Sequence, residues 1–445
     1  FHAGTAFITV DFHQLGNSEP YVYKTVDFGA SWQSIVGNLP KSIFSYVHVV
    51  REDPTREGLL YLGTENSLYV SYNDGGSWHA LQGNLPHAPV HWLTVQPHFN
   101  DLVVSTYGRG FWIFDDVTHL QQLTDDVLSS PVHLFAPRDT YRFTPRESTN
   151  SQPDDPAAGE NPEPGAPINF YPQDLPDENI EMVIQDQNER HVKTLVLQAP
   201  RVGLNRAYWD LRYESSEVPM LRTSALEHSH VKVGDRGYRP PPDGGVVRPL
   251  ATPGSYKVKL TVGDEVLETQ LTILKDPQSE ATLEEMDELL EFQLQLRDMS
   301  NSVSILVNRI EWIRKDIIDL GQRFQGNSQY LTPLDLGKEL EQAVIEMEMK
   351  LFDVRLTGGS ARQDTIRWPR QLWAKISSLA QYSSGSDHKP TDQSLEVLEL
   401  YKANIQEILT DWRQFEAEDL NNFNRMLIDS SLPPFSRMLV TILRW

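Results

Sequence analysis

The segment Lys24–Pro40, KTVDFGASWQSIVGNLP, decides the fold, because it recurs as Val70–Pro86, VSYNDGGSWHALQGNLP. The aspartate or asparagine, the glycine and the tryptophan of the two copies are 46 residues apart, at 27 and 73, 29 and 75, and 32 and 78. A repeat of about this length that holds several short strands is typical of β-propeller blades. The sequence therefore predicts the terminal blades of a propeller over residues 1–120.

Short segments with strand-like patterns surround each copy of the repeat. A first group, from Ala6, has three segments and lacks an initial strand, a second at Ser45–Leu81 has four, and a third ends at Phe114 without another copy of the turn. A propeller has to pair its strand edges. We therefore expect upstream blades from the same precursor or from a separate chain, and we interpret Phe1 as an internal position of a longer precursor.

Both repeated turns fit the pattern Ser/Thr-x-Asp/Asn-x-Gly-x-x-Trp, which is the Asp-box of BNR-repeat propellers. The acidic or amide side chain is expected to accept hydrogen bonds from backbone amides, the glycine to adopt a left-handed conformation, and the tryptophan to pack between blades. These roles are structural and lie away from a propeller's central channel. The residues with predicted structural roles are Thr25, Asp27, Gly29, Trp32, Ser71, Asn73, Gly75 and Trp78.

The rest of the chain divides by pattern into three further parts. Residues 121–165 form a connector that ends in an acidic, proline-rich linker, and residues 166–276 contain short alternating segments typical of an immunoglobulin-like β-sandwich. The stretch Arg239–Gly245 is expected to be a surface insertion in this sandwich. From residue 277 the period becomes helical, beginning with a capping box of Thr282 and Glu285. Residues 277–445 are therefore predicted to form an α-helical bundle.

Composition excludes several classes of partner. The 445 residues include 62 acidic and 39 basic side chains, for a net charge of −23, which disfavours a nucleic-acid partner. The sequence contains no apolar run of about 18 residues, so we expect no membrane span. Cysteine is absent, which excludes disulfides and thiolate metal sites.

Several segments resemble one family over nearly the whole chain. Ser105–Leu120, STYGRGFWIFDDVTHL, resembles the closing blade of large secreted bacterial BNR-repeat proteins of the sortilin-like family that are usually labelled glycosyl hydrolases. The resemblance implies a secreted or periplasmic protein and no known catalytic residue set. Further segments resemble the same family in the expected order: Val132–Arg142, Asn161–Tyr171, Gly203–Tyr213, Pro253–Leu260, Asp364–Leu379 and Pro390–Leu395.

Four residues near the end of the predicted propeller are candidates for chemistry. Tyr107 and Arg109 are candidate ligand-binding residues, since Arg109 can clamp a carboxylate with two hydrogen bonds. Arg109, Asp115 and Asp116 are candidate catalytic residues, because a pair of carboxyl groups can hydrolyse glycosidic bonds. The alternative is that Gly108–Gly110 is a tight turn, that Arg109 contacts a neighbouring blade, and that the two aspartates end a strand.

No metal site or cofactor is predicted from the thirteen histidines. They include no HxxxH or HExxH pair, and His228 and His230 are expected in a solvated loop. Our first interpretation is a secreted or periplasmic, non-catalytic propeller protein that acts as a scaffold or binds protein, peptide or glycan ligands. The alternative is a glycoside hydrolase, sialidase-like or of another BNR-propeller type, with its site in the propeller channel.

Overall fold

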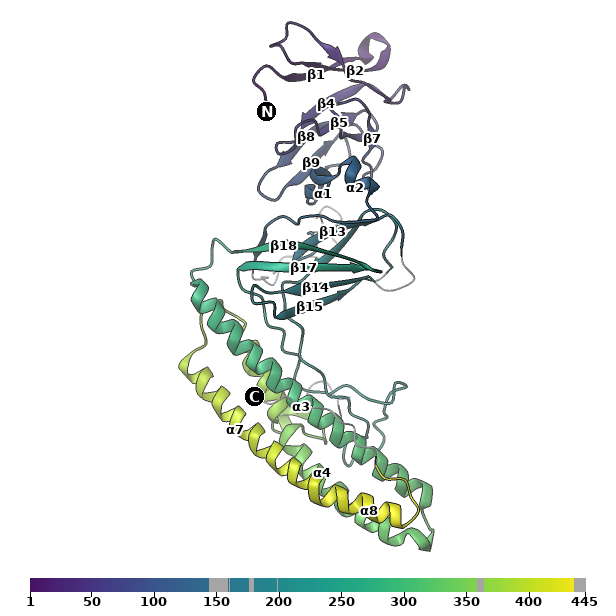
Figure 1. The fold of residues 1–445 in the computed structure, drawn as a ribbon, viewed down its shortest axis with the longest axis vertical. Helices are drawn as coiled ribbons and strands as arrows, with labels where there is room; N and C mark the ends of the chain where they lie inside the picture. Colours follow the sequence, from purple (N-terminus) through teal and green to yellow (C-terminus); the bar gives the residue numbers. More distant parts are fainter. Residues whose placement is uncertain (144–158, 160, 176–179, 198, 358–363, 436–445) are drawn as a thin grey trace. The chain divides into compact units, whose positions relative to one another are not determined.

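The computed structural model describes residues 1–143, 159, 161–175, 180–197, 199–357 and 364–435 (Figure 1). The chain folds into two compact units, Phe1–Leu211 with Pro253–Asp276, and Arg212–Thr252 with Pro277–Trp445. The first unit consists mainly of β-sheets and the second mainly of helices, which confirms a multidomain chain that is β-rich and then helical. The predicted acidic linker before residue 166 lies mostly outside the described residues.

Three small antiparallel sheets follow one another at the N-terminus, each with its strands in chain order. They contain three, four and three strands, as the sequence predicts, although the strands after the repeated turns have only two residues each. The first sheet contains β1 (Ala6–Phe12), β2 (Asn17–Thr25) and β3 (Gln33–Ser34). The second contains β4 (Val47–Glu52), β5 (Leu60–Thr64), β6 (Leu68–Ser71) and β7 (His79–Ala80), and the third β8 (Val90–Gln96), β9 (Asp101–Thr106) and β10 (Phe111–Phe114).

The repeated turns have the predicted local geometry. In the second copy, Asn73 Oδ1 accepts a hydrogen bond from the Ser77 amide at 2.8 Å, and Ser71 Oγ accepts one from the Gly75 amide at 2.9 Å. Gly75 has φ 83°, a left-handed conformation that favours glycine. The first copy has the same contacts through Asp27 and Thr25. These side chains therefore stabilise their own turns.

The two repeat tryptophans differ in their packing. Trp78 is 3% exposed, lies in an apolar cluster with residues of the first sheet, and donates from Nε1 to the Ile35 carbonyl oxygen at 2.9 Å. Trp32 is 41% exposed. The predicted packing between sheets is therefore seen for Trp78, whereas Trp32 is exposed in this chain, so for Trp32 it stays a prediction.

Two further sheets complete the first unit and pack against each other through Trp209 and Tyr256, whose ring centroids are 5.1 Å apart. Trp209 is fully buried and belongs to the core between these sheets. The three-stranded sheet has the order β11 (Val132–Leu134), β13 (Ala166–Pro172), β16 (Asn205–Trp209). The five-stranded sheet has the order β12 (Thr140–Arg142), β18 (Glu265–Lys275), β17 (Gly254–Val262), β14 (Glu181–Gln185), β15 (His191–Val196). Helices α1 (Thr118–Gln122) and α2 (Asp125–Ser129) precede these strands.

The second unit is organised around α3 (Leu283–Phe324), which begins with the predicted capping box of Thr282 and Glu285. Helix α4 begins at Leu331, so Thr332 and Pro333 lie in its first turn. Within the described part of the chain, no helix is both long and apolar enough to cross a bilayer. The other helices are α4 (Leu331–Leu351), α5 (Asp364–Arg367), α6 (Leu372–Ser383), α7 (Asp392–Phe415) and α8 (Asn421–Asp429), with a π-helical turn at Glu416–Leu420 between the last two.

The segment Arg212–Thr252 belongs to the helical unit, although the sequence placed it in the sandwich. The extended backbone of this segment runs along α3, and side chains of α3 accept hydrogen bonds from its backbone amides. Asn301 Oδ1 accepts from the Glu217 amide and Asn308 Oδ1 from the Met220 amide, both at 2.6 Å. The expected insertion Arg239–Gly245 therefore does not lie in the sandwich; Arg239 is buried and donates to the Thr223 and Leu356 carbonyl oxygens, whereas Pro240 and Gly244 are exposed.

Candidate functional site

A row of five aromatic rings crosses one end of the three N-terminal sheets. The β1–β2 connection, the start of β4, the start of β8 and the β9–β10 hairpin each contribute to it. Neighbouring ring centroids are 4.6, 5.4, 4.2 and 5.7 Å apart, and the first and last pairs are stacked. We call this feature the ring row; in order, its members are His13, Tyr46, His48, His91 and Tyr107.

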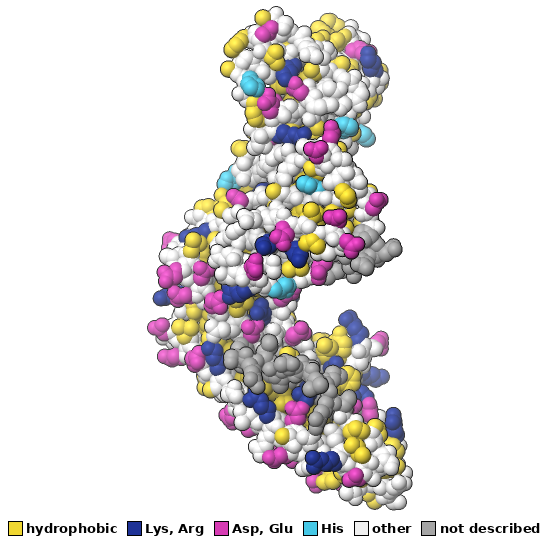
Figure 2. Space-filling view, in the orientation of Figure 1, with side chains coloured by type: hydrophobic (Ala, Val, Ile, Leu, Met, Phe, Trp, Pro, Cys, Tyr) yellow, Lys and Arg dark blue, Asp and Glu magenta, His cyan; other side chains and the backbone are white. Residues whose placement is uncertain are grey.

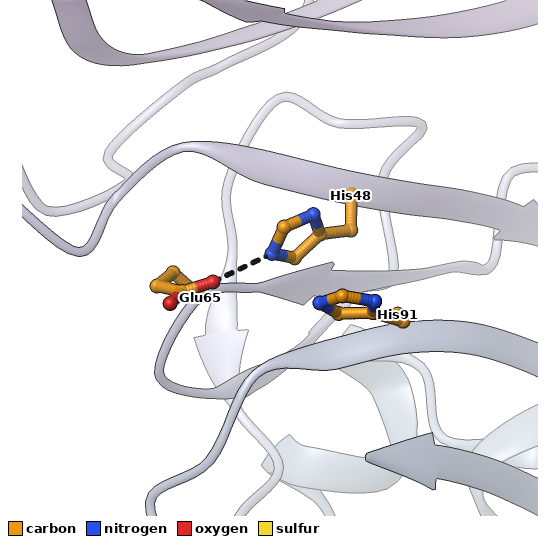
Figure 3. Close-up of side chains that lie close together, drawn as sticks. All are labelled: His48, Glu65 and His91. Atoms are coloured by element: carbon orange, nitrogen blue, oxygen red, sulfur yellow. Dashed lines mark hydrogen bonds and ion pairs between the residues drawn. The ribbon is translucent and has the colours of Figure 1, made fainter. Parts of the chain in front are cut away.

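Two carboxylates contact the histidines of the ring row. Asp11 Oδ1 lies 2.7 Å from His13 Nδ1, and Glu65 Oε2 lies 2.8 Å from His48 Nε2. Glu65 follows β5 and faces the rings of His48 and His91, which come from adjacent strands of the second and third sheets (Figure 3). Ligand atoms of these three residues all lie within 4.8 Å of one another.

Local contacts set the protonation of this cluster. Burial, followed by the neighbouring Glu65 carboxylate, raises the pKa of Tyr46 to about 12, so its hydroxyl stays protonated at neutral pH. Burial, followed by the neighbouring His48, lowers the pKa of His91. At neutral pH His91 therefore favours the uncharged form, which has a nitrogen lone pair available for a ligand.

Tyr107 lies at the open end of the ring row and is 73% exposed. The structure therefore places this predicted ligand-binding residue beside His91, in a cluster that the sequence did not identify. Arg109 follows in the same hairpin, where Gly108 and Gly110 both have positive φ, as the tight-turn interpretation predicts. Arg109 is exposed and donates to the Gly108 carbonyl oxygen. Its expected contact with a neighbouring sheet is not among the contacts of the described residues.

Asp115 and Asp116 lie beyond the opposite end of β10 from the Tyr107 hairpin, so the structure separates the proposed arginine and aspartates. Asp116 is 1% exposed, and its Oδ1 accepts the Thr118 amide of α1. Arg206 of β16 donates to the carbonyl oxygens of both aspartates at 2.9 Å. Burial, followed by the charge of Asp101, raises the pKa of Asp115. These contacts agree with a strand-ending, structural role.

His119 of α1 is buried beside this junction. Burial, followed by the positive charge of Arg206, lowers its pKa to about 4, and its Nε2 has no hydrogen-bond partner. The ring lies between Phe114 and Phe135, with centroid distances of 6.1 and 6.3 Å. The native fold therefore requires neutral His119.

We expect the stability of the first unit to fall as pH decreases from 6.5 towards 4. The unfolded chain then protonates His119 at its ordinary pKa of 6.5, whereas the folded chain does not. The free energy of unfolding is reduced by about 3 kcal/mol at pH 4, and the reduction vanishes above pH 6.5. Urea unfolding of the wild type and His119→Leu across this range should show the pH-dependent difference between them. A constant difference would contradict the prediction.

The helical unit contains a cavity of about 490 Å³ lined by three arginines, Arg212, Arg248 and Arg370. Guanidinium groups suit anions, but those of Arg370 and Arg212 already have protein partners. Arg370 donates to Ser378 Oγ at 3.0 Å, and Arg212 donates to the Arg248 carbonyl oxygen at 2.7 Å. Because the lining comes from separate segments, no local sequence pattern identifies the cavity.

Comparisons with solved structures find remote neighbours of this chain, two of which are as follows. An ancestral GH74 enzyme has a TM-score of 0.20 and 12% identity over 60% of this chain and 35% of its own. The extracellular domain of a hybrid two-component system from B. thetaiotaomicron has a TM-score of 0.18 and 10% identity over 60% of this chain and 31% of its own. This chain thus spans about a third of each neighbour, and such TM-scores establish neither fold nor function. No protein-family profile matches the sequence, and no curated protein matches it.

Proposed function

We propose that this chain is part of a secreted or periplasmic, non-catalytic β-propeller protein that binds a polar ligand at the ring row. The observation that supports this most directly is the exposed ring of Tyr107 at the end of a row whose edges present imidazole nitrogens and a phenol oxygen. An open aromatic face beside hydrogen-bonding groups suits a glycan, which offers both apolar ring faces and hydroxyls.

The proposal includes further propeller blades on both sides of the three sheets. Trp78 is covered by the first sheet, whereas its counterpart Trp32 is exposed, as expected if a preceding blade packs there. On the last strand, Phe111 and Ile113 are exposed at 80% and 59%. A following or ring-closing blade would bury them. We expect these blades from the same precursor or from another chain.

Surface charge supports a ligand other than nucleic acid. The net charge of −23 repels phosphate backbones. On the face in view in Figure 2, basic side chains are interspersed with acidic ones rather than gathered in one stripe. A neutral or weakly charged ligand is consistent with this distribution.

A glycoside hydrolase is the alternative, and the raised pKa of Asp115 is the observation that favours it. A general acid needs a raised pKa and a second carboxyl group about 5–10 Å away across an open substrate cleft. Asp116 is buried, and the Arg206 guanidinium donates hydrogen bonds to the backbone carbonyl oxygens of both aspartates. These contacts support the binding function over hydrolysis.

Binding can be tested by isothermal titration of the chain with neutral oligosaccharides of defined length. We expect Tyr107→Ala to weaken binding about tenfold, which corresponds to about 1.4 kcal/mol for one lost ring contact. Tyr382→Ala is a matched control, because Tyr382 is 84% exposed and lies on α6 of the helical unit. It should leave binding unchanged.

Two outcomes would contradict the proposal. If both tyrosine variants bind as the wild type does, the ring row is not the binding surface. If the titrated oligosaccharide is shortened on prolonged incubation, and Asp115→Asn abolishes that cleavage, the hydrolase alternative replaces the binding function.

A further inference from the structure

We propose that His48, Glu65 and His91 form a binding site for a divalent transition-metal ion such as Zn²⁺. Two imidazoles and one carboxylate converge, with ligand atoms within 4.8 Å of one another. No other such group of three occurs among the residues that the structure describes. The sequence predicted no metal site, because these ligands come from β4, β8 and the connection after β5 rather than from one helix.

The ligand set selects the class of metal. Zinc binds imidazole nitrogen and carboxylate oxygen at about 2.0–2.2 Å, so adjacent ligand atoms of a tetrahedral site lie roughly 3.3 Å apart. The three side chains therefore have to close by no more than about 1.5 Å. Calcium and magnesium prefer all-oxygen sites, which makes them poor matches for two histidines.

Neighbouring contacts hold the side chains of His48 and Glu65 in place before a metal binds. The side chains of His48 and Glu65 are only 14% and 24% exposed, and His48 Nε2 already points at the Glu65 carboxylate. The Tyr46 ring packs edge-on against the His48 ring, with centroids 5.4 Å apart, which restricts the orientation of that imidazole. The Glu65 amide also donates to the Tyr46 carbonyl oxygen at 3.1 Å, which fixes the connection after β5.

Three protein ligands leave a tetrahedral ion with one open position. His91 is exposed, so this position is accessible to solvent and to a ligand oxygen. The Tyr107 ring stacks on His91 at 5.7 Å, so a molecule on the ion would also contact the end of the ring row. Metal binding itself does not depend on the ligand-binding function proposed above.

The test is isothermal titration of zinc chloride into the full chain after dialysis against a chelator, with excess Mg²⁺ and Ca²⁺ present. We expect one Zn²⁺ per chain. His48→Gln and His91→Gln should each weaken binding by at least about 100-fold, since even changes to outer-shell partners cost about 10–100-fold. Co²⁺ substitution should give the absorption bands of a four-coordinate ion.

His2→Gln is the matched control. His2 forms a comparable histidine–carboxylate pair with Glu57, at 2.9 Å, but it belongs neither to the ring row nor to the three-ligand group. Its replacement should leave zinc affinity unchanged, and circular dichroism should show that all variants are folded. Absence of zinc binding to the wild type, or binding that survives both ligand substitutions in folded protein, would overturn the inference.

The two proposals can fail separately. Titration of the oligosaccharide into metal-free and zinc-loaded chain distinguishes them. Zinc binding without oligosaccharide binding would overturn the ligand function and leave the metal site intact, whereas oligosaccharide binding without zinc binding would do the reverse.

Discussion

Trp78→Ala is expected to lower the stability of the N-terminal sheets by about 3–5 kcal/mol. The indole is almost fully buried against the first sheet and packs with Val22, Ile35 and Leu62. Its removal leaves a cavity between two sheets and eliminates the hydrogen bond to the Ile35 carbonyl oxygen. Hydrogen exchange of the β4–β7 amides should report this loss even if the rest of the chain stays folded.

Trp32→Ala is the matched substitution at the equivalent position of the repeat. Trp32 is 41% exposed and touches no preceding sheet among the described residues, so its replacement should cost less than about 1 kcal/mol. Equal effects of the two substitutions on this chain would contradict the difference in packing. A large effect of Trp32→Ala that appears only when upstream sequence is attached would support the proposed preceding blade.

The strands of the N-terminal sheets could be predicted because their signals are local. A turn such as Ser71–Trp78 has hydrogen bonds within a few residues of each other, and the same residues repeat 46 positions earlier. The burial of each tryptophan could not be predicted in this way. It depends on whether a neighbouring sheet is present, which distinguishes Trp78 from Trp32.

The ring row illustrates the same limit for the candidate site. Tyr107 is a candidate from the sequence because it lies near the end of the predicted propeller, but His48 and His91 lie on strands of different sheets, and no spacing rule connects them to Glu65. Adjacency in sequence was also misleading. Asp115 and Asp116 resemble an acidic pair, yet one is buried and both have backbone carbonyls bound to Arg206.

The helical unit could be predicted from the apolar period of α3, but its polar interior could not. Ser300, Ser304 and Glu311 interrupt the apolar face and are buried. In the sequence they look like breaks in the pattern. In the structure Ser304 and Glu311 bind the backbone of the segment Arg212–Thr252, which has no helix or long strand of its own to satisfy it.

Arg314→Met is expected to destabilise the helical unit by about 3–5 kcal/mol. Arg314 Nη1 lies 2.6 Å from Glu311 Oε1 and 2.9 Å from Glu348 Oε2, and all three side chains are at most 2% exposed. Glu311 also accepts hydrogen bonds from the Arg222 and Thr223 amides. Loss of the guanidinium would leave the Glu311 carboxylate buried without a cation. The segment Arg212–Thr252, which Glu311 holds through the Arg222 and Thr223 amides, should then become less stable.

Glu348→Gln is the matched control. Burial, followed by the charge of Glu311, raises the pKa of Glu348 well above its ordinary range, so its carboxyl group favours the protonated form and glutamine is close to an isostere. We expect a cost below about 1 kcal/mol in urea unfolding followed by far-ultraviolet circular dichroism. If Glu348→Gln costs as much as Arg314→Met, Glu348 is ionised in the native state. The triad would then hold two carboxylates against one guanidinium rather than a neutral set.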